Sequence, residues 1–341
     1  MGTRLDTPSS ERSAERKPGV FGRLGLRRRL GRLVKFILMP ELPDVVNYCQ
    51  ALNRVVKGQI LNEIDLRSPF LLRTVSPKLS MFHGERFTEA SREAKQLVLR
   101  FESGRRLLIH LMIAGRLRWR PTGKKVPQSN LQALFHFEHG TLLFTEAGKK
   151  KRARLYALPA EDAALEPFRK GGLEIASSTL AEFAERLTLR NHTLRRALTD
   201  QRLFSGIGNA YSDEILFSAG LSPLKLTQKL TTEEIDRLYQ ACKAVLEEWV
   251  KRLRSEVGDG FPEKVTAFHP QMAVHGRYGE PCRECGQTVQ RIRYASNETN
   301  YCPQCQNEGR LLADRSLSRL LKSDWPRSAE ELEYHLETRK R

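Results

Sequence analysis

Apolar positions along the chain change their period twice. From Pro43 to about Val56 the apolar residues recur at helical spacing, and Pro43 suits the first turn of a helix. The following stretch has the shorter period of strands, at 96–101, 107–113, 117–119 and 133–137. Ser103-Gly104 and His139-Gly140 are typical of hairpin turns between such strands. This part of the chain is therefore predicted to form a mainly antiparallel β domain with a leading helix.

After about Pro159 the helical period returns and continues to about Leu253. Its strongest segment opens at Thr231, where Glu234 completes a capping box, and one apolar face then runs through to Val250. The last 35 residues favour one or two helices, the second opened by Ser328 with Glu331. The pattern predicts a second, helical domain and a helical tail.

The positive net charge of the chain indicates a polyanionic partner. The chain of 341 residues is 40% hydrophobic, which is enough for ordinary cores, and its net charge of +18 attracts polyanions such as nucleic acid. No apolar run approaches the roughly 18 residues that cross a bilayer, and no secretion signal is evident, so no membrane role is expected. Residues 1–38 hold ten Lys and Arg against three acidic residues. They are interpreted as an arm without a core, or as a stretch preceding a true start at Met39.

Four of the six cysteines form a pattern with a specific chemistry. Cys282, Cys285, Cys302 and Cys305 are spaced as CxxC, sixteen residues, CxxC, which is typical of tetrahedral zinc. A site made only of thiolates leaves no open position for water, so the zinc is predicted to be structural, within a β-hairpin module. Cys49 and Cys242 stand alone in apolar helical patterns and are expected to be buried. Free and metal-binding thiols favour a reducing, intracellular compartment.

Three further segments carry a family resemblance. They are the start Met39-Pro-Glu-Leu-Pro-Asp-Val, the segment Ser91-Arg-Glu-Ala-Lys-Gln, and the glycine-bearing segment from Gly206 to Glu214. With the cysteines, they resemble the formamidopyrimidine-DNA glycosylase and endonuclease VIII family over roughly residues 39–307. The resemblance implies an α+β fold: an N-terminal β-sandwich-like domain with a leading helix, a helical helix-two-turns-helix domain and a C-terminal zinc β-hairpin. The expected divisions are 1–38, 39–160, 161–270, 271–307 and a tail at 308–341.

The same resemblance implies a covalent mechanism. After removal of Met39, the amine of Pro40 would attack the sugar and store the reaction as an iminium. Glu41 would assist by proton transfer, and Lys95, which the resemblance places on a strand, would contact the damaged nucleotide and aid elimination. If residues 1–38 stay attached, the nitrogen of Pro40 is an amide and cannot act as a nucleophile. The active form is therefore expected to begin at Pro40.

The resemblance also implies contacts to DNA. Gly208 and Asn209 are expected at phosphates, because a glycine turn followed by a helix start presents backbone amides to an anion. Asn297 stands where the family usually has an arginine, so charge is lost at the hairpin tip. Met112 or Ile113 would fill the space left by an extruded base. Residues 149–152 replace the family's arginine-phenylalanine loop, which leaves lesion preference open, and His110 is interpreted as structural.

The resulting hypothesis is a base-excision-repair enzyme that removes oxidised bases of the formamidopyrimidine and 8-oxoguanine type and then cuts the strand. It would bind damaged double-stranded DNA as a monomer and carry one zinc ion. Three alternatives stay open: an endonuclease VIII-like preference for oxidised pyrimidines, a noncatalytic binder of DNA lesions, and a zinc-ribbon regulatory protein with no base chemistry.

Overall fold

The described part of the chain begins just before its first helix. The computed structural model describes residues 39–148, 150–263, 268–294 and 297–313, together with Pro326, Ser328 and Glu331. Helix α1 spans Leu42–Val55, with Glu41 at its N-cap, so the helix predicted from Pro43 to Val56 is confirmed. The backbone N–H of Glu41 donates to Oδ2 of Asp44 at 2.8 Å, which satisfies one free donor at the helix start.

Eight antiparallel strands follow α1 and form two halves of one domain. They are β1 (Ile60–Leu66), β2 (Glu85–Glu93), β3 (Gln96–Phe101), β4 (Arg106–His110), β5 (Gly115–Pro121), β6 (Leu131–Phe137), β7 (Gly140–Glu146) and β8 (Arg154–Leu158). Their order is β5-β7-β6-β1-β2-β3-β4-β8. The β1–β2 pairing joins only Ile60 to Arg86 and Leu61 to Glu85, so the sheet folds there into two four-stranded layers. Both layers contribute to one core, which also contains the apolar face of α1, and the predicted β-sandwich is confirmed.

Two local expectations within this domain are wrong. The strand predicted at 107–113 ends at His110, because Met112 has a φ of +51° and cannot continue an extended backbone. The N–H of Met112 instead donates to Nδ1 of His110 at 3.0 Å and closes a turn before β5. Lys95 does not lie within a strand. It follows Ala94, whose φ is +50°, in the two-residue turn between β2 and β3.

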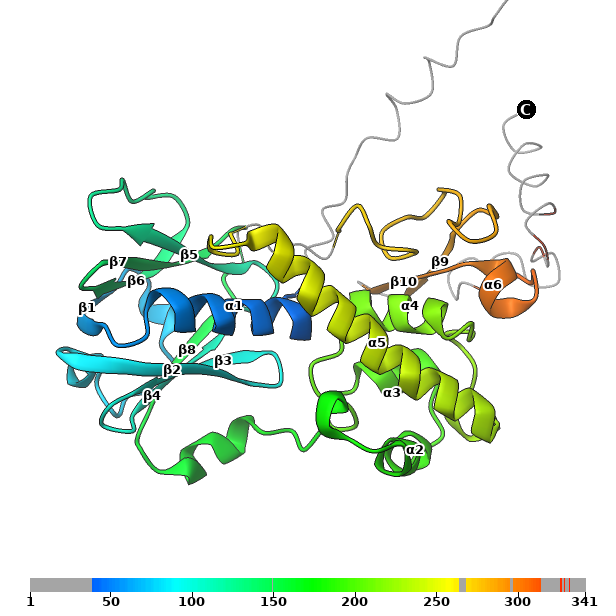
Figure 1. Cartoon of the computed structure of the whole chain (residues 1–341), viewed down its shortest axis with the longest axis horizontal. Helices are drawn as coiled ribbons and strands as arrows, with labels where there is room; N and C mark the ends of the chain where they lie inside the picture. The colour runs from blue at the N-terminus through cyan, green and yellow to red at the C-terminus, as the bar shows by residue number, and fades with distance from the viewer. Residues whose placement is uncertain are drawn as a thin grey trace, which may run out of the picture. The chain divides into compact units, whose positions relative to one another are not determined.

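The second part of the chain is helical, as predicted. Its α-helices are α2 (Leu180–Thr188), α3 (Leu194–Thr199), α4 (Asn209–Ser218) and α5 (Thr232–Val257), with short 3-10 helices at Pro69–Leu71, Leu79–Phe82, Asp162–Phe168, Ile175–Ser177 and Thr227–Lys229 elsewhere in the chain. Thr231 and Glu234 form the expected capping box at the start of α5. Helix α5 packs against α4 and also against α1 of the β domain (Figure 1). The helices enclose a core of their own.

The cysteine module forms the predicted hairpin. Strands β9 (Gln290–Tyr294) and β10 (Asn297–Tyr301) pair antiparallel, and α6 (Pro303–Asn307) follows. A small cluster of Val274, Val289 and two of the cysteines packs behind the hairpin. In the tail, the N–H of Glu331 donates to Oγ of Ser328 at 3.2 Å, as a helix start there requires, while the remaining predicted tail helix lies outside the described residues.

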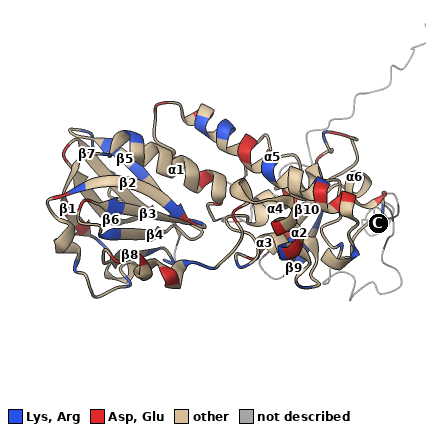
Figure 2. Ribbon diagram, turned by 60° about the horizontal axis from the view of Figure 1, so that its bottom comes forward, with Lys and Arg blue, Asp and Glu red and all other residues tan. Residues whose placement is uncertain are grey.

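The two cysteines outside the zinc pattern, Cys49 and Cys242, are buried, as expected. Lys and Arg occur in both the β domain and the helical part, so positive charge is not confined to one of them (Figure 2). Within the described part of the chain, no helix has the length and apolar character needed to cross a bilayer. The basic segment 1–38 lies outside the described residues.

Candidate active site and metal centre

The start of α1 and the glycine segment before α4 are bonded to each other. The N–H of Leu42 donates to the carbonyl of Gly206 at 3.0 Å, across the two domains. Gly206 has a φ of +80°, and an added Cβ would lie 2.7 Å from Cβ of Leu42. Pro40 is buried directly before this junction, and its nitrogen is in the peptide bond to Met39. The segment Gly206–Gly208 thus holds the Pro40-Glu41 dipeptide against the helical domain.

Glu41 occupies the N-terminus of α4. Its Oε2 accepts from the N–H of Gly208 at 2.6 Å and of Tyr211 at 3.3 Å, and its Oε1 accepts from Ala210 at 3.0 Å. The Glu41 side chain is buried, with 2% exposure. Three backbone donors and the positive end of a helix compensate the carboxylate for its lost hydration. These hydrogen bonds fix the Glu41 carboxylate beside Pro40, where it can accept or donate a proton without a change of conformation.

Gly208 is required by close packing and not by its φ of −130°. A carbon added to it would lie 2.4 Å from Cδ and Oε1 of Glu41 and 2.6 Å from Nζ of Lys95. The carboxylate and the ammonium therefore both face Gly208, although they come from the start of α1 and from the β2–β3 turn. The structure brings together Glu41, Lys95 and Gly208, which the sequence analysis selected from three separate segments.

The ammonium of Lys95 lies in a poorly solvated position. The residue is 7% exposed, and burial lowers its pKa, while the nearby charges of Glu41 and Asp44 oppose that effect and Lys170 adds to it. A lysine with a lowered pKa loses its proton more easily, so it can release a proton and take one up during a reaction. Lys95 thus has the environment of a proton-transfer group as well as a positive charge.

Asp44 is a site residue that the sequence analysis missed. Burial raises its pKa to about 7, helped by the charge of Glu41 and opposed by the N–H of Glu41 and by Arg116 and Lys95. Its acidic neighbour Glu41 and its cationic neighbours lie at the start of α1, on β5 and in the β2–β3 turn. Its position one turn into α1 is typical of an ordinary first-turn acid, so sequence alone gave no reason to select it.

We expect Asp44→Asn to alter the pH dependence of stability. Because the folded-state pKa is raised, the protonated form stabilises the fold below the unfolded value of 3.8, and that stabilisation is lost as pH rises toward about 7. Asparagine can still accept from the N–H of Glu41 but does not titrate. Relative to the variant, the free energy of unfolding of the unaltered protein should fall by about 2 kcal/mol between about pH 5 and about pH 8. Urea denaturation at the two pH values measures this difference, and a constant difference would contradict it.

The two asparagines expected at phosphates lie together. Nδ2 of Asn209, at the first position of α4, is 3.4 Å from Oδ1 of Asn297 at the start of β10. Both amides are at least partly accessible to solvent. Arg291 and Arg293 could replace the arginine absent at Asn297. Nη1 of Arg291 and Nε of Arg293 lie 3.6 and 3.7 Å from Oε2 of Glu298. Part of their charge is therefore neutralised within the hairpin.

The turn after β4 carries the two candidate wedge residues. Met112 and Ile113 are partly exposed there, and Nη1 of Arg116 donates to the carbonyl of Ile113 at 3.1 Å. Arg116 also acts electrostatically on Asp44, which links this turn to the site. Burial, with nearby lysines and an arginine, lowers the pKa of His110 to about 4, so its neutral ring accepts a hydrogen bond from the N–H of Met112.

The loop after β7 is tied to a buried acid. Oε1 of Glu146 accepts from the N–H of Arg152 at 2.7 Å and of Ala153 at 3.1 Å, and its backbone carbonyl accepts from Lys151. Lys149 lies outside the described residues. The lysine-rich loop is thus anchored at its end by Glu146.

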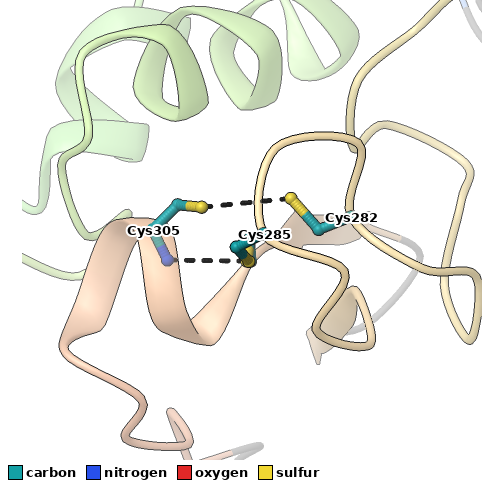
Figure 3. A group of neighbouring side chains, drawn as sticks. Cys282, Cys285 and Cys305 are labelled. Carbon is teal, nitrogen blue, oxygen red and sulfur yellow. Dashed lines mark hydrogen bonds between the residues drawn. The ribbon is translucent and has the colours of Figure 1, made fainter.

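The four clustered cysteines meet the geometric requirements of zinc. Their sulfurs lie within 4.8 Å of one another, with Cys282 and Cys305 at 3.9 Å and Cys285 and Cys302 at 3.4 Å. Figure 3 shows the thiols of Cys282 and Cys305 facing each other across the group. A tetrahedron with Zn–S bonds of about 2.3 Å has sulfurs about 3.8 Å apart, whereas a disulfide needs about 2.05 Å. Burial raises the pKa of the Cys302 thiol to about 11, so a divalent cation is needed to hold it as a thiolate near neutral pH.

Asp213, Glu214 and His275 were also missed, although the first two lie in the quoted glycine segment. Glu214 is buried and accepts from the N–H groups of Ala273, Val274 and His275 at 2.7, 3.0 and 2.9 Å. It thereby ties α4 to the segment before the zinc module. Nothing in the spacing of these residues predicted that α4 and the segment at 273–275 would meet.

Three regions of the chain match known domain families. Residues 39–152 match the formamidopyrimidine-DNA glycosylase N-terminal domain, residues 172–259 the corresponding H2TH domain, and residues 279–307 the zinc finger found in FPG and IleRS. With the geometry above, these matches define the class of helix-two-turns-helix DNA glycosylases, and the four cysteines are its structural zinc site.

Individual relatives agree with that class. Formamidopyrimidine-DNA glycosylases of Desulfitobacterium hafniense and Thermus thermophilus are 33% and 34% identical, over 79% and 80% of this chain and 100% of theirs. The crystal structure of the MutM (Fpg) protein from Thermus thermophilus has a TM-score of 0.67 at 33% identity, covering 79% of this chain and 100% of that one. A Lactococcus lactis Fpg in complex with abasic-site DNA has a TM-score of 0.70 at 25% identity, covering 78% and 99%. The chain belongs to the formamidopyrimidine-DNA glycosylase family, as the sequence analysis predicted.

Proposed function

We propose that this chain is a base-excision-repair DNA glycosylase with abasic-site lyase activity, acting on damaged double-stranded DNA. One observation carries the proposal: Glu41, beside Pro40, is fixed at the N-terminus of α4 and faces Lys95 across Gly208. The family's named activity and the DNA complex of its Lactococcus lactis member support the choice of substrate.

In the first step, the free amine of Pro40 attacks C1′ of the damaged nucleotide. A bond forms from nitrogen to C1′, the bond from C1′ to the base breaks, and the departing base takes up a proton. Glu41 donates to the sugar ring oxygen as the ring opens, which leaves an iminium between Pro40 and C1′. The attack requires a nitrogen lone pair, so the active form begins at Pro40.

In the second step, the iminium acidifies the adjacent C2′ position. Removal of a C2′ proton moves an electron pair toward the iminium and expels the 3′ phosphate, which cuts the strand. Lys95 and Glu41 are proposed to carry these protons, which is supported by their shared position against Gly208 and by the lowered pKa of Lys95. Hydrolysis of the iminium by water then frees Pro40.

The DNA-facing residues are proposed to be Gly208, Asn209 and Asn297 at phosphates, with Met112 or Ile113 filling the space of the extruded base. The pairing of Asn209 with Asn297 supports a shared phosphate contact, because two amides can donate to one anion. The enzyme is proposed to act as a monomer in an intracellular compartment, with domain divisions near residues 160, 270 and 307.

We propose oxidised purines as the preferred lesion class, because the relatives are named formamidopyrimidine-DNA glycosylases. The replaced loop anchored by Glu146 favours, as a second candidate, a preference closer to oxidised pyrimidines, because its lysines differ in shape and charge from the expected arginine and phenylalanine. Excision from matched duplexes with 8-oxoguanine or an oxidised pyrimidine distinguishes the two.

Borohydride trapping tests the proposed chemistry. Protein expressed from Met39, with Met39 removed, should form a covalent adduct with abasic and 8-oxoguanine duplexes. One residue added before Pro40 should reduce trapping at least about a thousandfold, because it converts the amine to an amide. DNA binding without trapping by the protein that begins at Pro40 would instead identify a noncatalytic lesion binder.

A further inference from the structure

One peptide group connects the glycine segment to the proposed proton-transfer group Glu41. The carbonyl oxygen of Ile207 accepts from Nε2 of Gln201 at 2.6 Å, and the N–H of Gly208 donates to Oε2 of Glu41 at 2.6 Å. This carbonyl and this N–H belong to the planar peptide between Ile207 and Gly208, so they point in opposite directions. Gln201 and Glu41 therefore bind opposite edges of the same peptide.

The side-chain amide of Gln201 is hydrogen-bonded at both of its ends. Its Oε1 accepts from the N–H of Gly206 at 2.9 Å, and its Nε2 also donates to the carbonyl of Thr199 at 3.2 Å. Because the N–H of Gly206 only donates and the two carbonyls only accept, one orientation of the amide satisfies all three. The side chain thus bridges the end of α3 and the glycine segment.

The backbone of Gln201 is closely packed as well. A carbon added to Gly172 would lie 2.3 Å from the carbonyl oxygen of Gln201, which leaves no room between the two segments. Two hydrogen bonds of 2.9 Å, from the N–H of Leu173 to the carbonyl of Leu203 and from that of Ser205 to the carbonyl of Leu173, fix the same contact. The Gln201 side chain is therefore attached to a backbone with little freedom to move.

The peptide between Ile207 and Gly208 requires such a contact because a glycine follows it. Glycine permits rotations of a neighbouring peptide that other residues resist. Half a turn of this plane would direct the carbonyl of Ile207 at the Glu41 carboxylate and would remove one of its three backbone donors. The hydrogen bond from Gln201 opposes that rotation, and it polarises the peptide so that the N–H of Gly208 is a better donor.

We propose that Gln201 is a positioning residue for base excision, which holds the Ile207–Gly208 peptide with its N–H toward Glu41 and so fixes the Glu41 carboxylate beside Pro40. This inference rests on the proposed function, because it concerns the proton transfer assigned to Glu41. The side-chain hydrogen bonds of Gln201 go to backbone groups, so its effect on Glu41 passes through the peptide.

The test is single-turnover excision from an 8-oxoguanine duplex by Gln201→Glu protein that begins at Pro40. The new carboxylate keeps the length of the side chain and the acceptor for Gly206, but it cannot donate to Ile207 until it is protonated. Two facing carbonyls favour the protonated form, so the pKa of this carboxyl should lie above its ordinary value of about 4.3. Because the protonated carboxyl is a donor, the lost hydrogen bond should return as pH falls.

The expected rate of the variant relative to the unaltered protein is about thirtyfold lower at about pH 8 and only about threefold lower at about pH 5, since a positioned proton-transfer group contributes about a hundredfold or more. The protein concentration that gives half of the maximal rate should stay within about twofold, because the substitution changes proton transfer and not DNA binding. A side chain that merely joined α3 to the glycine segment would give a deficit independent of pH.

The charged and titratable groups around Gln201 do not bond to its amide in the described part of the chain. Asp200 and Arg202 flank it along the chain and pair with each other at 2.6 Å. Arg186 of α2 donates to the backbone carbonyl of Arg202 at 3.5 Å, His192 acts electrostatically on Asp200, and Glu41 lies across the peptide. All of them are present in every variant at position 201, so a ratio of rates at one pH removes their own titration.

Gln59→Glu is the matched control. Gln59 also binds two backbone groups, accepting from the N–H of His139 at 3.0 Å and donating to the carbonyl of Val55, but it lies beyond the opposite end of α1 from Glu41. Its rate relative to the unaltered protein should be the same at both pH values. Gln201→Met has neither a donor nor a proton to titrate and should remain slow at both.

Two results overturn the inference while leaving the proposed function intact. One is a rate for Gln201→Glu and Gln201→Met within about twofold of the unaltered protein at both pH values. The other is a deficit of Gln201→Glu that is equal at both pH values. Absence of excision by the unaltered protein overturns the proposed function and the inference together.

Discussion

Gly208→Ala should abolish most base excision while leaving the fold in place. The added carbon would lie within 2.6 Å of the Glu41 carboxylate and of Nζ of Lys95, and neither group has free space to move because both are buried. Displacing groups that transfer protons by about 1 Å costs about a hundredfold in rate, and here two groups move together. Single-turnover excision by protein that begins at Pro40 should therefore slow by about a hundredfold or more.

Gly260→Ala is the control for that substitution. Its added carbon would approach only the carbonyl of Val257, at 3.0 Å, and it lies outside the site. Circular dichroism should be the same for both variants, with a loss of stability of about 1–3 kcal/mol for Gly208→Ala from overpacking. An excision rate for Gly208→Ala within about twofold of the unaltered protein would show that the Glu41 and Lys95 positions do not control the chemistry.

Cys302→Ser should remove zinc and nearly all DNA binding. Cys302 has no exposure, and the small cluster around it consists of two valines and Cys282, with Phe217 and Cys305 packed against them. Without the metal, so small a module cannot hold β10, which carries Asn297 and contacts Asp213 through Asn300. We expect zinc content near zero and DNA affinity lower by about a thousandfold, since several phosphate contacts are lost together.

Cys49→Ser separates this effect from general loss of a buried cysteine. Cys49 is also buried but donates to the carbonyl of Ser91 at 3.2 Å, a bond that a serine hydroxyl can keep. That variant should retain one zinc per chain and normal DNA affinity, measured by metal analysis and anisotropy. Full DNA affinity in metal-free Cys302→Ser would exclude a role of the module in binding.

Much of the fold could be predicted because its signals are local. The period of apolar residues identified α1 and α5, and the capping residues Thr231 and Glu234 marked where α5 begins. The cysteine spacing identified the metal site, because ligand geometry restricts spacing. The end of β4 was misplaced because Leu111, Met112 and Ile113 are all apolar, and nothing in that composition reveals the positive φ of Met112.

The candidate site was predictable only where sequence motifs pointed to it. Pro40, Glu41 and Lys95 were selected by resemblance, and the structure places the carboxylate and ammonium against one glycine. Asp44 and His275 were not selected, because their environments arise from contacts between distant segments. The raised pKa of Asp44 depends on its burial and on charges from Glu41, from β5 and from the β2–β3 turn, and the pairing of His275 depends on α4 meeting the segment at 273–275. Such contacts have no periodic signal along the chain.

The most direct test of the proposed chemistry is the identity of the nitrogen that joins the DNA. Protein that begins at Pro40 can be trapped with borohydride on an abasic duplex, digested, and its cross-linked peptide sequenced by mass spectrometry. We predict that the sugar is attached to the nitrogen of Pro40. Attachment to Nζ of Lys95 would contradict this prediction, because the amine of Pro40 would then not be the nucleophile.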